Sequence, residues 1–83
     1  MASSTAVDRS LEIQRDLSSL ARRGGPELVR SVFREFCARK KIEPLLDEFD
    51  IEGSITTQIC TLNDRFRGQF RQSVCKAIKK ARQ

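Results

Sequence analysis

The chain contains no histidine, no tryptophan and no tyrosine among its 83 residues. Without histidine it lacks the side chain that most often acts as a general acid or base near neutral pH, and the commonest metal ligand. It also has no Gly-rich phosphate loop and no carboxylate pair isolated in an apolar segment. We therefore expect a protein that is not an enzyme, with no catalytic residue and no cofactor.

Cysteine is scarce as well, with only Cys37, Cys60 and Cys75 present. None of them forms a CxxC pair and no histidine can complete a zinc site, so we expect no metal centre. The N-terminal residues lack a secretory signal, and no apolar run approaches the ~20 residues of a membrane span. An odd number of cysteines without such a signal is typical of a reducing compartment, so we expect the cytosol or the nucleus and disfavour a membrane partner.

Charge, by contrast, is abundant: 16 basic and 11 acidic residues give a net charge of +5. We expect residues 1–83 to form a single helical domain, with residues 1–4 disordered and residues 81–83 a frayed basic C-terminus. A chain of this length buries only about 60 to 65% of its unfolded surface, so its stability margin is small.

The first predicted helix begins at Thr5, whose side chain can cap it together with Asp8. It ends at the Gly-Gly-Pro sequence of residues 24–26, where Gly24 suits a left-handed C-terminal position. At 100° per residue, one face of this helix forms a narrow stripe of Ala6, Ser10, Ile13, Leu17 and Leu20. Leu11 is expected to lie opposite this stripe, either exposed or in a second contact.

The second predicted helix runs from about residue 26 to residue 40 and has the strongest apolar face. That face comprises Leu28, Val29, Val32, Phe33 and Phe36. Pro44 is expected to stop this helix, because the residue before a proline is pushed out of the helical region. Pro44 can also open a short helix over residues 44–50, with Leu45, Leu46 and Phe49 turned inward.

The last predicted helix covers residues 55–80, a length of about 39 Å, and is capped by Ser54. Its apolar positions drift around the helix, which favours packing across two or more other helices. Gly68 lies off this stripe and marks either a kink or a close approach by a partner. We therefore predict an all-α fold, a small bundle or angled array of three main helices and one short helix, with the last helix longest.

Residues 48–59 resemble the calcium-binding loop of the EF-hand family. Counted from Glu48, Asp50, Glu52 and Gly53 take positions 3, 5 and 6, as in that family. Position 12, however, is Ile59, where an EF-hand has the bidentate glutamate that closes the site. We therefore predict that this stretch does not bind calcium and that its acidic residues begin a helix instead.

The charges are segregated along the second half of the chain. Residues 42–64 contain six acidic residues and no basic one, whereas residues 65–83 contain seven basic residues and no acidic one. Acid near the start of a helix and base near its end both complement the helix dipole. The basic residues, which are the candidate contacts for a polyanion or an acidic surface, are Arg65, Arg67, Arg71, Lys76, Lys79, Lys80 and Arg82.

Because the last predicted helix has more apolar length than the shorter helices can cover, our first hypothesis is a protein-interaction module. It would be a small subunit or adaptor that docks a larger partner or a second copy. The predicted interface comprises Leu62, Phe66, Phe70, Val74 and Ile78. The second hypothesis is a small nucleic-acid-binding protein that uses the basic C-terminal helix. A membrane surface or a calmodulin-type groove is a weaker alternative for the same helix.

Overall fold

The computed structural model describes the backbone of residues 2–82 and the side chains of residues 9–81. Three helices make up this part of the chain, which contains no strand: α1 (Ala2–Lys40), α2 (Ile51–Cys60) and α3 (Asp64–Arg82). The predicted all-α class is therefore confirmed. Met1 and Gln83 lie outside the described residues, so the expected disorder of residues 1–4 and fraying of residues 81–83 stay predictions.

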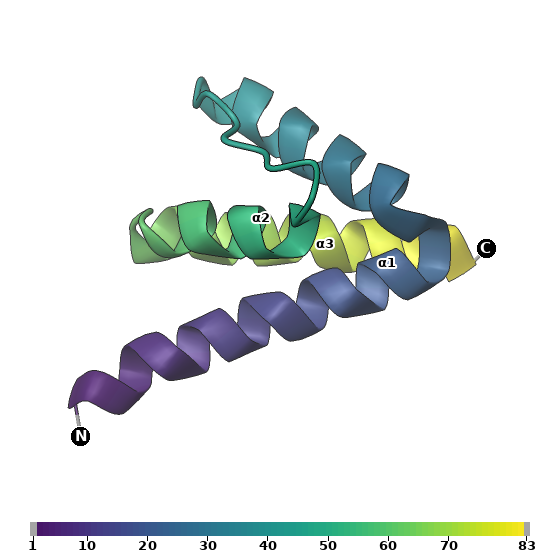
Figure 1. The fold of residues 1–83 in the computed structure, drawn as a ribbon. Helices are drawn as coiled ribbons and strands as arrows, with labels where there is room; N and C mark the ends of the chain where they lie inside the picture. The colour runs from purple at the N-terminus through teal and green to yellow at the C-terminus, as the bar shows by residue number, and fades with distance from the viewer. Residues whose placement is uncertain (1, 83) are drawn as a thin grey trace.

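The first helix, α1, bends sharply at Gly25, where φ is 73° and ψ is −176°. Only glycine adopts this conformation readily, because a Cβ atom would clash with the backbone. Pro26 follows directly and has no N–H to donate to the preceding turn. The predicted break between two helices is therefore present, but the left-handed residue is Gly25 and not Gly24. The bend divides α1 into an N-terminal arm (residues 2–24) and a C-terminal arm (residues 26–40), which Figure 1 shows at an angle to each other.

The start of α1 also differs from the prediction. The helical backbone already begins at Ala2, so Thr5 lies within the helix and not at its N-terminal cap. The side chains of Thr5, Ala6 and Asp8 lie outside the described residues, so their predicted roles stay predictions.

The C-terminal arm ends before Pro44 is reached. Lys41 takes a left-handed conformation with φ of 58°, and the Ile42 N–H donates to the Cys37 carbonyl at 2.9 Å. This is the hydrogen bond that closes a Schellman motif, which satisfies a carbonyl left free at the end of the helix. The C-terminal arm therefore ends at Lys40 because of this motif and not because of Pro44.

Residues 44–50 do not form the short helix that we predicted. Gln58 holds this segment instead: its Nε2 donates to the Glu43 carbonyl at 2.8 Å, and its Oε1 accepts the Leu45 N–H at 2.7 Å. The glutamine thus satisfies backbone groups that a helical turn would have paired internally. The predicted inward orientation of Leu45 and Phe49 is also wrong, because their exposed fractions are 64% and 102%, and only Leu46 is partly buried.

The long last helix is broken as well. α2 begins at Ile51 with Asp50 as its cap, whose Oδ1 accepts the Gly53 N–H at 3.1 Å, so Ser54 is not the cap. It ends at Cys60, and α3 restarts after Asn63, whose Oδ1 accepts the Phe66 N–H at 2.8 Å. An asparagine in this position is a typical N-terminal cap. The short helix is therefore α2, and the longest is α1.

The two arms of α1 enclose α3 from two directions (Figure 1). The pairs Arg9–Asp64 and Asp16–Arg71 both join residues 55 positions apart, so the N-terminal arm runs parallel to α3. The C-terminal arm runs antiparallel, with Arg39 beside Ser73. The shared core confirms most of the predicted helical stripes. Its buried apolar residues are Ile13, Leu17, Leu20, Val29, Phe33, Phe36, Cys37, Ile55, Ile59, Phe70 and Val74.

Candidate binding surfaces

The predicted partner interface, which comprises Leu62 before α3 and four residues on α3, packs against the chain itself. Phe70 and Val74 have an exposed fraction of 0%, and Leu62, Phe66 and Ile78 are partly buried against the same core. Lys40 Nζ lies over the Phe66 ring, 5.3 Å from the ring centroid. α3 has 19 residues instead of about 26 and lies between the arms of α1, so the predicted excess of apolar length is not present.

Two of the seven basic residues predicted to contact a partner, Arg67 and Arg71, make contacts within the chain. The side chain of Arg67 is only 12% exposed, pairs with Asp64, and donates to the carbonyls of Cys60 and Leu62. A cation at this position stabilises the C-terminal end of α2, whose last carbonyls have no helical partner. Arg67 is therefore a helix cap and not a free surface charge.

Arg71 joins α3 to the N-terminal arm of α1. Its Nε donates to Asp16 Oδ2 at 2.8 Å and its Nη1 to Glu12 Oε2 at 3.0 Å. The hydrogen bond to Asp16 is the main cause that raises the pKa of Arg71 above its ordinary value, and the negative charges of Asp16 and Glu12 add to it. The charge of Arg71 is thus balanced within the chain and is not available to a polyanion.

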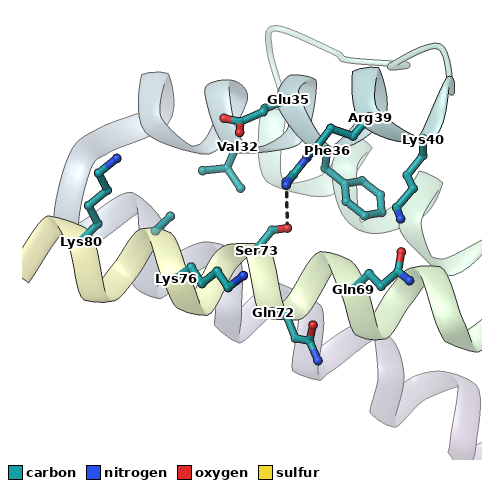
Figure 2. Close-up of a pocket in the computed structure, with 11 residues that line it drawn as sticks. Val32, Glu35, Phe36, Arg39, Lys40, Gln69, Gln72, Ser73, Lys76 and Lys80 are labelled. Carbon is teal, nitrogen blue, oxygen red and sulfur yellow. Dashed lines mark hydrogen bonds between the residues drawn. The ribbon is translucent and has the colours of Figure 1, made fainter.

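Two other predicted basic contacts, Lys76 and Lys80, line a groove between α3 and the C-terminal arm of α1 (Figure 2). The groove has a volume of about 480 Å³, and Arg39 and Lys40 contribute two more positive charges from its opposite wall. Glu35 is the one acidic residue among the residues that line it. We call this surface the basic groove. Arg65 and Lys79 are exposed and do not line it, and the side chain of Arg82 lies outside the described residues.

The basic groove also contains two uncharged polar side chains. Arg39 Nη2 donates to Ser73 Oγ at 3.2 Å, which leaves the hydroxyl proton of Ser73 free to donate (Figure 2). Gln69 Oε1 is buried and has no hydrogen-bond partner among the described residues. Sequence reasoning missed the contribution of α1 to this groove, although the run Arg39-Lys40-Lys41 at the end of a predicted helix was a signal for it.

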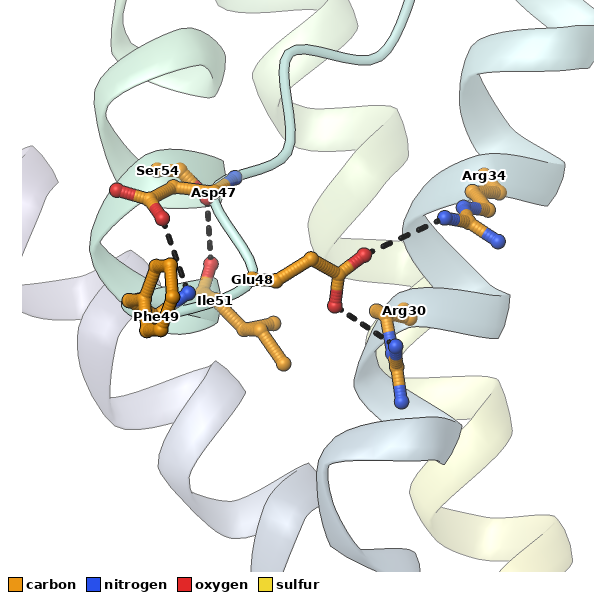
Figure 3. A network of polar contacts seen from close by, with 7 residues as sticks. All are labelled: Arg30, Arg34, Asp47, Glu48, Phe49, Ile51 and Ser54. Atoms are coloured by element: carbon orange, nitrogen blue, oxygen red, sulfur yellow. Dashed lines mark hydrogen bonds and ion pairs between the residues drawn. The ribbon is translucent and has the colours of Figure 1, made fainter.

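The second notable surface is the acidic loop (residues 43–52), which contains five acidic residues and no basic one. Its backbone is braced by hydrogen bonds: Asp47 N–H donates to Ser54 Oγ at 3.1 Å, and Phe49 N–H donates to Asp47 Oδ1 at 2.9 Å. Glu48 adds ion pairs with Arg30 at 2.8 Å and Arg34 at 3.7 Å on the C-terminal arm of α1. Figure 3 shows Glu48 extended toward these arginines and the Phe49 ring on the other side of the turn.

The carboxylates of the EF-hand-like stretch have structural partners. Glu48 binds two arginines, Asp50 caps α2, and Glu52 Oε1 accepts the hydroxyl of Ser18 at 3.0 Å. Ile59 lies fully buried in the core. Within the described part of the chain, no cluster of three or more His, Cys, Asp or Glu side chains has an arrangement that could hold a metal ion.

The three cysteines are free thiols in different surroundings. Cys37 is buried in the core, and this burial raises its pKa above the ordinary value of 9.0, which keeps the thiol protonated. Cys60 is partly buried and Cys75 is exposed on α3.

Comparisons of this chain with protein-family models, with curated proteins and with solved structures find no significant match. Within the described residues, no helix is both long and apolar enough to cross a membrane. The basic groove and the acidic loop are the two surfaces with a distinct charge.

Proposed function

We propose that this chain is a non-enzymatic protein-interaction module, a small subunit or adaptor that contacts its partner through the acidic loop. The observation that supports this most directly is Phe49, a large apolar side chain that is completely exposed on a braced turn. Aromatic side chains are the residues that most often anchor protein interfaces. Leu45, in the same loop, adds a second exposed apolar side chain.

The rigidity of the turn supports an anchoring role. Binding normally requires loops and side chains to become ordered, which costs about 0.5 to 1.5 kcal/mol for each immobilised side chain. Here Asp47, Glu48 and Asp50 already fix the backbone on both sides of Phe49. Burial of the phenyl ring in a partner pocket would then contribute about 1.5 to 3 kcal/mol with little further loss of backbone entropy.

The charge of the loop indicates the chemistry of the partner. Glu48 is paired with two arginines, but the other four acidic residues of the loop form no ion pair among the described residues, so a phosphate-rich surface would be repelled. The complementary partner is a protein with an apolar pocket bordered by basic residues. We propose the cytosol or the nucleus as the compartment, because an odd number of cysteines is typical of a reducing environment.

The experiment replaces Phe49 with a photo-crosslinking phenylalanine analogue and irradiates the tagged chain in living cells. We expect a specific protein adduct that an excess of the unlabelled wild-type chain prevents from forming, but that an excess of the Phe49→Ala chain does not. The matched control carries the analogue at Leu11, another exposed large apolar residue, on a helix and outside the acidic loop.

Three results would count against the proposal. The first is equal adducts from positions 49 and 11, and the second is competition by Phe49→Ala that equals competition by the wild type. The third is an adduct made only with a second copy of the chain, which would replace the adaptor by a self-associating protein. Since Phe49 is exposed, Phe49→Ala should keep the wild-type melting temperature, so loss of competition cannot be attributed to unfolding.

A further inference from the structure

We infer that the basic groove binds the phosphodiester backbone of a single-stranded nucleic acid. This site is separate from the acidic loop, and it differs from a basic C-terminal helix acting alone because α1 supplies half of its charge. Arg39 and Lys40 stand on one wall and Lys76 and Lys80 on the other, with Glu35 as the single opposing charge (Figure 2). The groove therefore has a net charge of +3 from these five side chains.

The arrangement of the basic side chains favours a single strand over a duplex. Its walls are two helices in contact, and the Arg39–Ser73 hydrogen bond of 3.2 Å connects them directly. A duplex carries a phosphate backbone on both sides of its stacked base pairs, whereas the four basic side chains line one groove between two touching helices and can follow a single backbone. Residues 69 to 80 of α3 extend along the groove for roughly 16 Å, so a strand that lies in it can pass all four basic side chains.

The polar groups of the groove match the chemistry of a phosphodiester. An anionic oxygen can replace Ser73 as the acceptor for Arg39, and the free hydroxyl proton of Ser73 can then donate to the same phosphate. Base N–H groups and, in RNA, sugar hydroxyls add hydrogen-bond donors that inorganic polyphosphate at neutral pH lacks, so the uncharged polar lining of the groove favours a nucleic acid.

The test measures the affinity of the purified chain for a fluorescent 30-nucleotide single strand between 50 and 200 mM salt. Four phosphate contacts predict that log K falls with log salt with a slope of about −2.8, at roughly −0.7 for each contact on a single strand. The double variant Lys76→Gln/Lys80→Gln should reduce the slope to about −1.4 and weaken binding about 25-fold at 0.1 M salt. Glu35→Gln should strengthen binding, because it removes the one negative charge of the groove.

The matched control is Arg65→Gln/Lys79→Gln, which removes two exposed charges of the same helix that do not line the groove. It should keep the slope near the wild-type value, and both double variants should keep the wild-type circular dichroism spectrum because exposed charges contribute little to stability. Phe49→Ala should leave the affinity unchanged, which separates this inference from the function proposed for the acidic loop.

Parallel measurements with oligo-U, oligo-dT, a duplex of equal charge and inorganic polyphosphate distinguish the sources of phosphate. Binding of either single strand with the expected slopes supports the site, and the tighter of the two identifies the natural polymer. Equal losses in the two double variants would assign binding to general charge and overturn the site. Duplex or polyphosphate bound as tightly as the single strands would overturn the proposed ligand, and so would a lack of measurable single-strand binding at 50 mM salt.

Discussion

Replacement of Phe70 by alanine tests both the core and the reason why the apolar face of α3 is closed to a partner. The Phe70 ring is fully buried between two aromatic rings of the C-terminal arm of α1. Its centroid lies 6.2 Å from that of Phe33 at an interplanar angle of 88°, and 5.2 Å from that of Phe36 at 70°. Both pairs have the edge-to-face geometry that aromatic rings prefer.

The expected cost follows from these contacts. Phe→Ala substitutions in protein cores cost about 3 to 5 kcal/mol, which includes the cavity that remains. A domain of this length has a free energy of unfolding of about 4 to 12 kcal/mol. Phe70→Ala should therefore remove a large part of the stability, and much of the variant should be unfolded at 37 °C. Phe70→Leu keeps most of the volume but loses both aromatic pairs, so its cost should be about 1 to 3 kcal/mol.

Urea denaturation followed by circular dichroism at 222 nm measures these differences without the fluorescence of tryptophan or tyrosine, which the chain lacks. Leu11→Ala is the control on α1: the Leu11 side chain is 44% exposed, so the loss should stay below about 1 kcal/mol. If Phe70→Ala lowered stability no more than Leu11→Ala, the ring would not be part of the core. The predicted interface on α3 would then be open to a partner after all.

Four further predictions address the backbone and the thiols. Gly25→Ala should cost about 1 to 3 kcal/mol in urea titrations, because its positive φ strains any other residue. Gly68→Ala should raise the melting temperature by stabilising α3 by up to about 1 kcal/mol, since an added Cβ meets no atom within 4 Å. A thiol reagent should modify Cys75 rapidly in the folded chain and Cys37 only on unfolding. Burial raises the pKa of Cys37 above 9.0, so the thiol of the unfolded chain loses its proton at a lower pH than that of the folded chain. The contribution of Cys37 to the free energy of unfolding should therefore be constant below pH 9 and decrease as the pH rises toward the pKa of the folded state. The Cys37→Ala variant should not show this decrease.

The buried faces of the two arms of α1 were predictable from the sequence. Ile13, Leu17 and Leu20 recur at helical spacing, and Phe33 and Phe36 do so in the second arm. The helical spacing of apolar residues is enough to identify these positions, because a helix that packs on one side must keep its apolar residues on that side. The break at residues 24–26 was equally legible, since glycine and proline restrict the backbone locally.

Residues 44–50 could not be assigned in the same way. Pro44 and the apolar residues after it fit the start of a helix, but Gln58, 13 to 15 residues away, pairs with the backbone of the loop. Such a contact depends on the tertiary fold and leaves no periodic pattern. The break at residues 61–63 did leave a local signal, because Asn63 followed by Asp64 is a typical helix start. The apolar pattern, which continues through the break, concealed it.

For the candidate surfaces, the sequence predicted the sign of the charge but not which residues form each surface. The excess of base in residues 65–83 indicated a cationic surface, yet the pairing of Arg71 with Glu12 and Asp16 joins residues more than 50 positions apart. The exposure of Phe49 was not predictable from the sequence, because a large apolar residue is more often turned inward. What places it outside is the bracing of the turn by its own carboxylates.

Arginine and lysine make different contacts in this fold. Every ion pair among the described residues uses an arginine, whereas none of the five lysines takes part in one. The planar guanidinium holds a carboxylate or a carbonyl in a fixed geometry, as Arg71 and Arg67 do, while a lysine keeps its charge on a flexible stem in water. The acidic residues therefore neutralise mainly the arginines that position the helices and the acidic loop. Much of the remaining positive charge belongs to lysines, two of which, Lys76 and Lys80, face Arg39 across the basic groove, so the same charge segregation that stabilises the fold leaves this groove cationic.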